Sequence, residues 1–148
     1  MYWNHNTAYH PWVVAHVRSQ AGRVLDVGSG DGLLLERLAP VVDNVVGIEC
    51  DECTAEASRE RLATVPNVSI VTSTFPDDQF APSSFDAVLF VASLHHMDPR
   101  QALRGARALL KPGGQLLVVG LVRNASAPDW LFSALVLPFS RISSALHN

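Results

Sequence analysis

Three glycines and an aspartate stand close together near the start of the chain, in the stretch VLDVGSGDG at residues 24–32. Asp26 precedes the first glycine by two residues, and Gly28, Gly30 and Gly32 alternate with polar residues. Glycine lets a backbone turn tightly and approach a ligand without a Cβ in the way. A carboxylate beside such a loop can pair with an ammonium group. The spacing therefore indicates a ligand-binding loop.

A dinucleotide site is the first alternative for this loop. Its pattern is G-x-G-x-x-G, and its helix N-terminus faces a pyrophosphate. Here Gly32 comes one position early, and Leu33 stands where the pattern requires glycine. The carboxylate of Asp26 would also repel a pyrophosphate. An NAD-dependent oxidoreductase therefore remains the less favoured reading.

Cys50 and Cys53 form a C-x-x-C pair in the stretch CDEC. Such a pair is typical of a redox dithiol or of half a zinc site. The chain has no further cysteine to complete a zinc site. The two acids between the thiols would raise the thiol pKa values, which disfavours a reactive dithiol. We therefore predict no metal site.

The elements that must position these residues alternate along the chain. Short apolar runs predict buried strands at 23–27, 44–49, 67–72, 85–92 and 115–121. Helical spacing predicts helices at 32–40, 51–63 and 98–110, with the stretch KPGG ending the last helix.

Helix-start signals support two of these helices. Asp51 and Asp98 are suitable N-caps, and Pro99 and Gln101 supply a first-turn proline and a capping-box glutamine. Five strands separated by helices predict an α/β fold with a doubly wound, mostly parallel sheet.

Composition limits the class of protein. The chain has 148 residues, 48% of them apolar and 17% charged, which favours one folded domain over disorder. The net charge of −3 argues against a nucleic-acid partner. The N-terminus lacks the pattern of a signal peptide, and no apolar stretch reaches the ~20 residues that span a bilayer. We therefore expect a cytoplasmic protein without a membrane span.

The glycine stretch resembles motif I of the class I S-adenosylmethionine-dependent methyltransferases. SSFDAVLFVASLHH at 83–96 is similar to that family's fourth-strand motif, and LLKPGGQLLVVG at 109–120 to the helix, turn and strand that follow. The resemblance covers roughly residues 10 to 121. It implies a Rossmann-like sheet of strand order 3-2-1-4-5, S-adenosylmethionine as cofactor, and methyl transfer to a small, apolar acceptor molecule.

The resemblance also implies roles for individual residues. Asp26 would lie near the amino group of the cofactor, and Glu49, at the end of the second strand, would accept hydrogen bonds from both ribose hydroxyls. A carboxylate suits this role because it is acceptor-only with two oxygens. Cys50 directly follows and would line the same pocket. The expected cofactor contacts are Asp26, Gly28, Ser29, Gly30, Gly32, Leu33, Glu49, Cys50, Thr74, Phe75 and Val91.

The adenine contact departs from the family pattern. Many relatives have an aspartate at the end of the third strand, where this chain has Thr74 followed by Phe75. The Thr74 hydroxyl can accept one hydrogen bond, and the Phe75 backbone N–H can donate one. Asp77 or Asp78 is the alternative.

His95 and His96 follow the fourth strand and are the predicted catalytic residues. Methyl transfer is an in-line displacement that depends on positioning, and a base is needed only where the acceptor loses a proton. Histidine is a suitable general base near neutral pH. His95 is favoured because it directly follows Leu94. The alternative is that either histidine only caps or packs at the strand end.

The remaining segments complete a single domain of residues 1–148. Residues 1–22 are expected to form an N-terminal helical cap, 23–121 the cofactor-binding core, and 122–148 an apolar C-terminal helix. In one alternative the cap folds over the cofactor through Tyr9, His10 and Trp12. In the favoured alternative it covers the sheet, with Trp12, Val13 and Val17 facing the core.

The family usually has a seven-stranded sheet, so the C-terminal strands are expected to be missing here. The fifth strand would then be an exposed edge, which proteins usually cover or pair. We therefore expect a homo-oligomer or a partner at this edge or at the C-terminal helix. A non-catalytic cofactor-binding module that needs a partner stays open as an alternative function.

Overall fold

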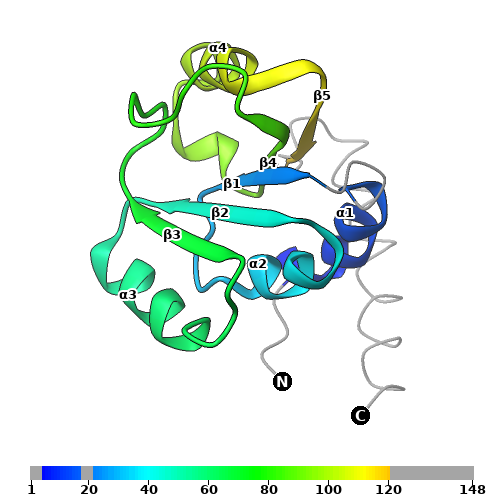
Figure 1. The fold of residues 1–148 in the computed structure, drawn as a ribbon. Helices are drawn as coiled ribbons and strands as arrows, with labels where there is room; N and C mark the ends of the chain where they lie inside the picture. Colours follow the sequence, from blue (N-terminus) through cyan, green and yellow to red (C-terminus); the bar gives the residue numbers. More distant parts are fainter. Residues whose placement is uncertain (1–4, 18–21, 121–148) are drawn as a thin grey trace, which may run out of the picture.

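The computed structural model describes residues 5–17 and 22–120 (Figure 1). Within these residues, five parallel strands form one sheet in the order β3-β2-β1-β4-β5. The predicted α/β class and the Rossmann-like strand order are therefore confirmed. The strands are β1 (Arg23–Val27), β2 (Asn44–Glu49), β3 (Val68–Thr72), β4 (Phe85–Val91) and β5 (Leu110–Val119).

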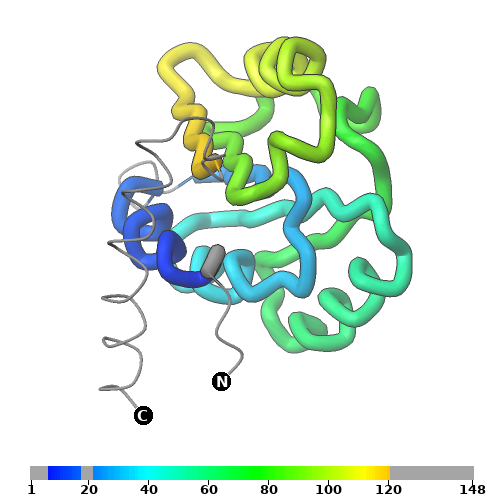
Figure 2. Tube along the Cα trace, turned by 180° about the vertical axis from the view of Figure 1, so that it is seen from behind, coloured from blue at the N-terminus to red at the C-terminus, as the bar shows by residue number. Residues whose placement is uncertain are grey.

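Helices cover both faces of this sheet. α1 and α2 contribute to one apolar core cluster and α4 to the other, and Figures 1 and 2 both show α1 beside α2. The helices and 3-10 turns are η1 (His5–Tyr9), α1 (His10–Val17), α2 (Leu33–Leu38), η2 (Ala39–Val41), α3 (Glu52–Arg61), η3 (Leu94–His96) and α4 (Pro99–Leu109). Among the described residues, no helix has the length and apolar character to cross a membrane.

β1 is the centre of the core. Side chains alternate between the two faces of a strand, so Val24 packs into the cluster under α1 and α2 while Leu25 packs into the cluster under α4. Because helices cover both faces, every residue from 24 to 27 is buried, including the polar Asp26.

The predicted helix starts are confirmed. The side chain of Asp51 accepts a hydrogen bond from the Thr54 N–H at 2.8 Å, and that of Asp98 accepts one from the Gln101 N–H at 2.8 Å. Pro99 occupies the first turn of α4, as expected. These caps begin α3 and α4 directly after the loops that follow β2 and β4.

Two sequence predictions need correction. β5 begins at Leu110 instead of residue 115, because Leu110 pairs with Phe85 ahead of an irregularity in the register. Trp12 is not part of the core stripe of α1: it is 49% exposed, whereas Val13 and Val17 are fully buried. The predicted C-terminal helix at 122–148 lies outside the described residues.

The side chain of Asn67 joins the turn before β3 to the segment before β2. Its amide donates to the Ala39 carbonyl at 2.8 Å and to the Val42 carbonyl at 3.1 Å. Both acceptor residues are buried, so the Asn67 amide supplies these carbonyls with hydrogen bonds where water has little access.

Replacing Asn67 by alanine is expected to lower the free energy of unfolding by about 1–3 kcal/mol, because buried carbonyls lose their donor. Urea unfolding measures this difference. Ser69→Ala is the matched control, since Ser69 is exposed on β3, and it should change the free energy by less than about 0.5 kcal/mol. Equal effects of the two substitutions would contradict this role of Asn67.

Candidate functional site

The loop between β1 and α2 takes a path that requires glycine. Gly28, Gly30 and Gly32 have φ angles of 76°, 55° and 77°, in the left-handed region that side chains disfavour. At Gly28 a Cβ would also lie 2.6 Å from the Cβ of Ser93. At Gly30 a Cβ would meet no atom within 4 Å, which leaves this position open to a ligand.

Hydrogen bonds tie this loop to the end of β2. The N–H groups of Gly28 and Ser29 both donate to the Ile48 carbonyl, at 2.8 and 3.0 Å. The Gly30 N–H donates to Oε2 of Glu49 at 3.0 Å, and the Asp51 N–H donates to Oε1 at 3.0 Å. The Glu49 carboxylate is therefore held at the carboxyl ends of β1 and β2.

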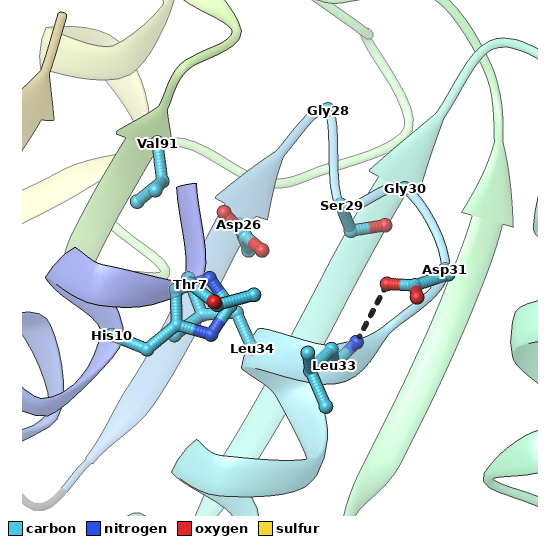
Figure 3. Close-up of a pocket in the computed structure, with 10 residues that line it drawn as sticks. All are labelled: Thr7, His10, Asp26, Gly28, Ser29, Gly30, Asp31, Leu33, Leu34 and Val91. Atoms are coloured by element: carbon cyan, nitrogen blue, oxygen red, sulfur yellow. Dashed lines mark hydrogen bonds between the residues drawn. The ribbon is translucent and has the colours of Figure 1, made fainter. Parts of the chain in front are cut away.

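A cavity of about 460 Å³ lies at the carboxyl ends of β1 and β4 (Figure 3). This is the point where the strand order reverses, and ligands of doubly wound sheets bind at such a point. The lining residues are Thr7, His10, Asp26, Gly28, Ser29, Gly30, Asp31, Leu33, Leu34 and Val91.

Asp26 is the most perturbed titratable group of the cavity. It is only 3% exposed, and burial followed by the nearby charge of Glu49 raises the pKa of its carboxyl to about 7. The lining residues include no lysine or arginine and a single histidine. The site can therefore stabilise a cationic group brought by a ligand.

That histidine is His10, the first residue of α1, which is 6% exposed. Its Nδ1 is buried and has no hydrogen-bond partner. Burial, followed by the charge of Arg37, lowers the pKa of the imidazole, while the charge of Asp31 acts in the opposite direction. The sequence named His10 only in the less favoured alternative, in which the N-terminal segment folds over the cofactor; the packing of α1 beside α2 brings it to the cavity.

The structure brings part of the predicted site together. Asp26, Gly28, Ser29, Gly30, Leu33 and Val91 all line the cavity. Glu49 does not line it but is bonded to Gly30, which does. Gly32 is buried, and a Cβ on it would meet Ser58 and Leu62.

The predicted adenine wall lies outside this cavity. Cys50 and Thr74 are exposed. The Phe75 ring packs edge-on against Phe90, with 5.7 Å between the ring centroids. Cys50 and Cys53 are both free thiols, and the described part of the chain holds no cluster of three or more His, Cys, Asp or Glu residues that could bind a metal. The adenine contacts stay a prediction.

His95 and His96 form the short η3 turn after β4. Both are exposed, their ring centroids lie 3.9 Å apart, and neither lines the cavity. Their role as a base therefore stays a prediction.

Comparison with known proteins gives consistent matches. A family model described as a methyltransferase domain matches residues 25–118. An uncharacterized methyltransferase of Mycobacterium tuberculosis is 38% identical over 125 residues, which cover 81% of this chain and 61% of the relative. A ubiquinone biosynthesis O-methyltransferase of Erwinia tasmaniensis is 32% identical over 127 residues, which cover 82% of this chain and 51% of the relative. The chain thus spans about half to three fifths of the length of these relatives.

Solved structures share the fold. An amino pentose methyltransferase of Micromonospora echinaspora with S-adenosylmethionine bound superposes with a TM-score of 0.68 and 26% identity, covering 82% of this chain and 58% of the other. A putative methyltransferase of Bacillus halodurans gives a TM-score of 0.67 and 26% identity, covering 80% and 55%.

The buried carboxyl of Asp26 makes stability depend on pH. Its folded pKa of about 7 lies above the ordinary value near 4, so the folded protein holds a proton that the unfolded chain releases, and stability falls as pH rises between these values. Asp26→Asn removes this loss. The free energy of unfolding of Asp26→Asn minus that of the unsubstituted protein should therefore rise by about 2–3 kcal/mol from pH 5 to pH 8. Urea unfolding without ligand measures both values.

Asp43→Asn is the control for this measurement, because Asp43 is an exposed acid outside the cavity. Its effect on stability should be the same at both pH values. An Asp26→Asn difference that does not grow with pH would contradict a buried, proton-holding Asp26.

Proposed function

The chain belongs to the class I S-adenosylmethionine-dependent methyltransferase family, and on this basis we propose that it binds S-adenosylmethionine beside the glycine loop and transfers the methyl group to a small, apolar acceptor molecule. The observation that carries the proposal is the buried carboxyl of Asp26 at the glycine loop, whose ionised form the cofactor's ammonium group would stabilise. Because the chain spans only part of its relatives, the activity and the acceptor are both proposals.

The residues present fit the cofactor. Asp26 would hold the ammonium group, and the open position at Gly30 lets the ligand approach the backbone. Ser29 is also on the cavity wall, and its buried hydroxyl has no hydrogen-bond partner in the protein. When bound, S-adenosylmethionine supplies an electrophilic methyl group on a sulfonium centre.

Glu49 is the proposed partner of the ribose hydroxyls. Each of its oxygens already accepts one backbone N–H, from Gly30 and from Asp51. Oε1 also accepts a hydrogen bond from the Cys50 thiol at 3.6 Å. A carboxylate offers about four lone-pair sites, so Oε2 can accept one more hydrogen bond, and a ribose hydroxyl at Oε1 would replace the thiol. These two bonds to the backbone fix the orientation in which the carboxylate meets the ligand.

The acceptor side of the proposal rests on the apolar wall of the cavity. Leu33, Leu34 and Val91 contribute aliphatic surface there. Matched relatives are named for ubiquinone biosynthesis, which supports a small-molecule acceptor with a hydroxyl group. For such an acceptor we propose His95 as the base that takes the hydroxyl proton, with His96 as the alternative.

Association of the chain is also a proposal. β5 is the last strand on one side of the described sheet, and its Leu116 and Val118 are 40% and 44% exposed. An apolar strand in this position favours pairing with a second copy or a partner.

Substitution of Glu49 by alanine is expected to weaken S-adenosylhomocysteine binding at least about tenfold, because two charge-assisted hydrogen bonds to the ribose are lost. Isothermal titration calorimetry measures the affinity, with NADH as the comparison ligand. Glu52→Ala is the matched control, since Glu52 is an exposed acid on α3 that pairs with Arg59. Its affinity should be unchanged.

Three outcomes of this titration would count against the proposals. Unchanged affinity in Glu49→Ala would refute the ribose assignment. Binding of NADH without S-adenosylhomocysteine would replace the methyltransferase by an oxidoreductase, and no binding of either ligand would remove the cofactor proposal.

His95→Asn is expected to lower turnover on a hydroxyl acceptor about 100-fold or more, because a general base is lost. S-adenosylhomocysteine affinity should not change. The assay follows S-adenosylhomocysteine formation over a panel of phenolic acceptors. The control is His16→Asn, a histidine that is exposed on α1. If His95→Asn and His16→Asn have equal turnover, His95 is not the general base and has only a structural role.

A further inference from the structure

His10 lines the cavity, and the proposed function gives it no role. Its imidazole is buried. It is 6% exposed, and Nδ1 has no partner in the protein. A buried polar atom without a partner carries a free-energy cost that a ligand can remove. Figure 3 shows the imidazole reaching the cavity from α1, while Asp26 reaches it from the end of β1.

The backbone of the glycine loop offers few free donors. Of the six N–H groups from Gly28 to Leu33, five already donate within the protein. The acceptors are the Ile48 carbonyl, the Glu49 carboxylate, the Ser29 carbonyl and the Asp31 carboxylate. The Asp31 N–H is the one that remains in this loop, so further hydrogen bonds to an anionic group of a ligand need side-chain donors.

Among the lining residues, His10 alone has a nitrogen-bearing side chain, and its imidazole carries an N–H donor even in the neutral form that burial favours. The charged groups around it are Asp26 and Asp31 in the lining and Arg37 on α2. Asp26 and Asp31 would repel a ligand carboxylate, and Arg37 is not part of the lining. A hydrogen bond from the imidazole N–H would offset part of that repulsion.

We propose that His10 donates a hydrogen bond to the carboxylate of the cofactor's amino-acid portion, while Asp26 holds the ammonium group on the same carbon atom. This assignment rests on the proposed function, since it presumes S-adenosylmethionine in the cavity. A ligand with both charges is then recognised by two buried side chains from different elements, α1 and β1. The N-terminal helix therefore determines affinity for the amino-acid end of the ligand, and the end of β2 for its ribose.

The test compares three ligands by isothermal titration calorimetry. S-adenosylhomocysteine has both charged groups, decarboxylated S-adenosylmethionine keeps the ammonium and lacks the carboxylate, and 5′-methylthioadenosine lacks the whole amino-acid portion. The variant is His10→Leu, which keeps an apolar volume and removes the donor. His16→Leu, on the exposed side of the same helix, is the matched control.

The dissociation constant of S-adenosylhomocysteine should rise about ten- to one-hundredfold in His10→Leu and less than about twofold for each of the other two ligands. His10→Gln retains an amide donor and should restore part of the lost affinity. His16→Leu should bind all three ligands like the unsubstituted protein. Circular dichroism of each variant verifies the fold, and His10→Gln serves as the test if His10→Leu does not fold.

Equal loss of affinity for S-adenosylhomocysteine and 5′-methylthioadenosine would overturn the assignment, because the effect would then not depend on the carboxylate. Unchanged affinity for S-adenosylhomocysteine in the His10 variants would overturn it as well. If the unsubstituted protein binds none of the three ligands, the proposed function itself fails, and the role of His10 falls with it.

Discussion

The attachment of the glycine loop to the end of β2 is the constraint on which the site depends. Two loop N–H groups share the Ile48 carbonyl and a third binds Glu49, so the first and second strands present one continuous edge to a ligand. The attachment is possible only because Gly28 and Gly30 adopt left-handed conformations. These bonds use three of the six N–H groups from Gly28 to Leu33, and two more donate within the loop, so few backbone donors are left for a ligand.

Asp26 carries the energetic consequence of this arrangement. Its place in β1 between two covered faces removes the carboxyl from water, and the nearby Glu49 adds further repulsion to its ionised form. A residue chosen only for stability would be apolar here, like Leu25 beside it. Under the proposed function, a cationic ligand would compensate this carboxylate, and the stability lost in the free state would return as affinity.

α1 connects the core to the site. Val13 and Val17 anchor the helix in the apolar cluster under α2, and this packing places His10 over the cavity. The two interpretations of the N-terminal segment are therefore compatible: one helix covers the sheet with its apolar residues and reaches the ligand cavity with its first residue. Trp12 and Tyr9, which are about half exposed, contribute to neither role within the described residues.

Local patterns in the chain were sufficient to predict the five strands, their order through the family resemblance, the caps at Asp51 and Asp98, and the loop at Gly28 and Gly30. These features depend on neighbouring residues: a strand on its apolar run, a cap on a side chain three positions away, a left-handed turn on the absence of a Cβ. The cavity wall at His10, the exposure of Trp12 and the start of β5 at Leu110 depend on contacts between distant segments. Only tertiary packing decides such contacts, because the position of one helix beside another is set by complementary surfaces and not by spacing within either helix.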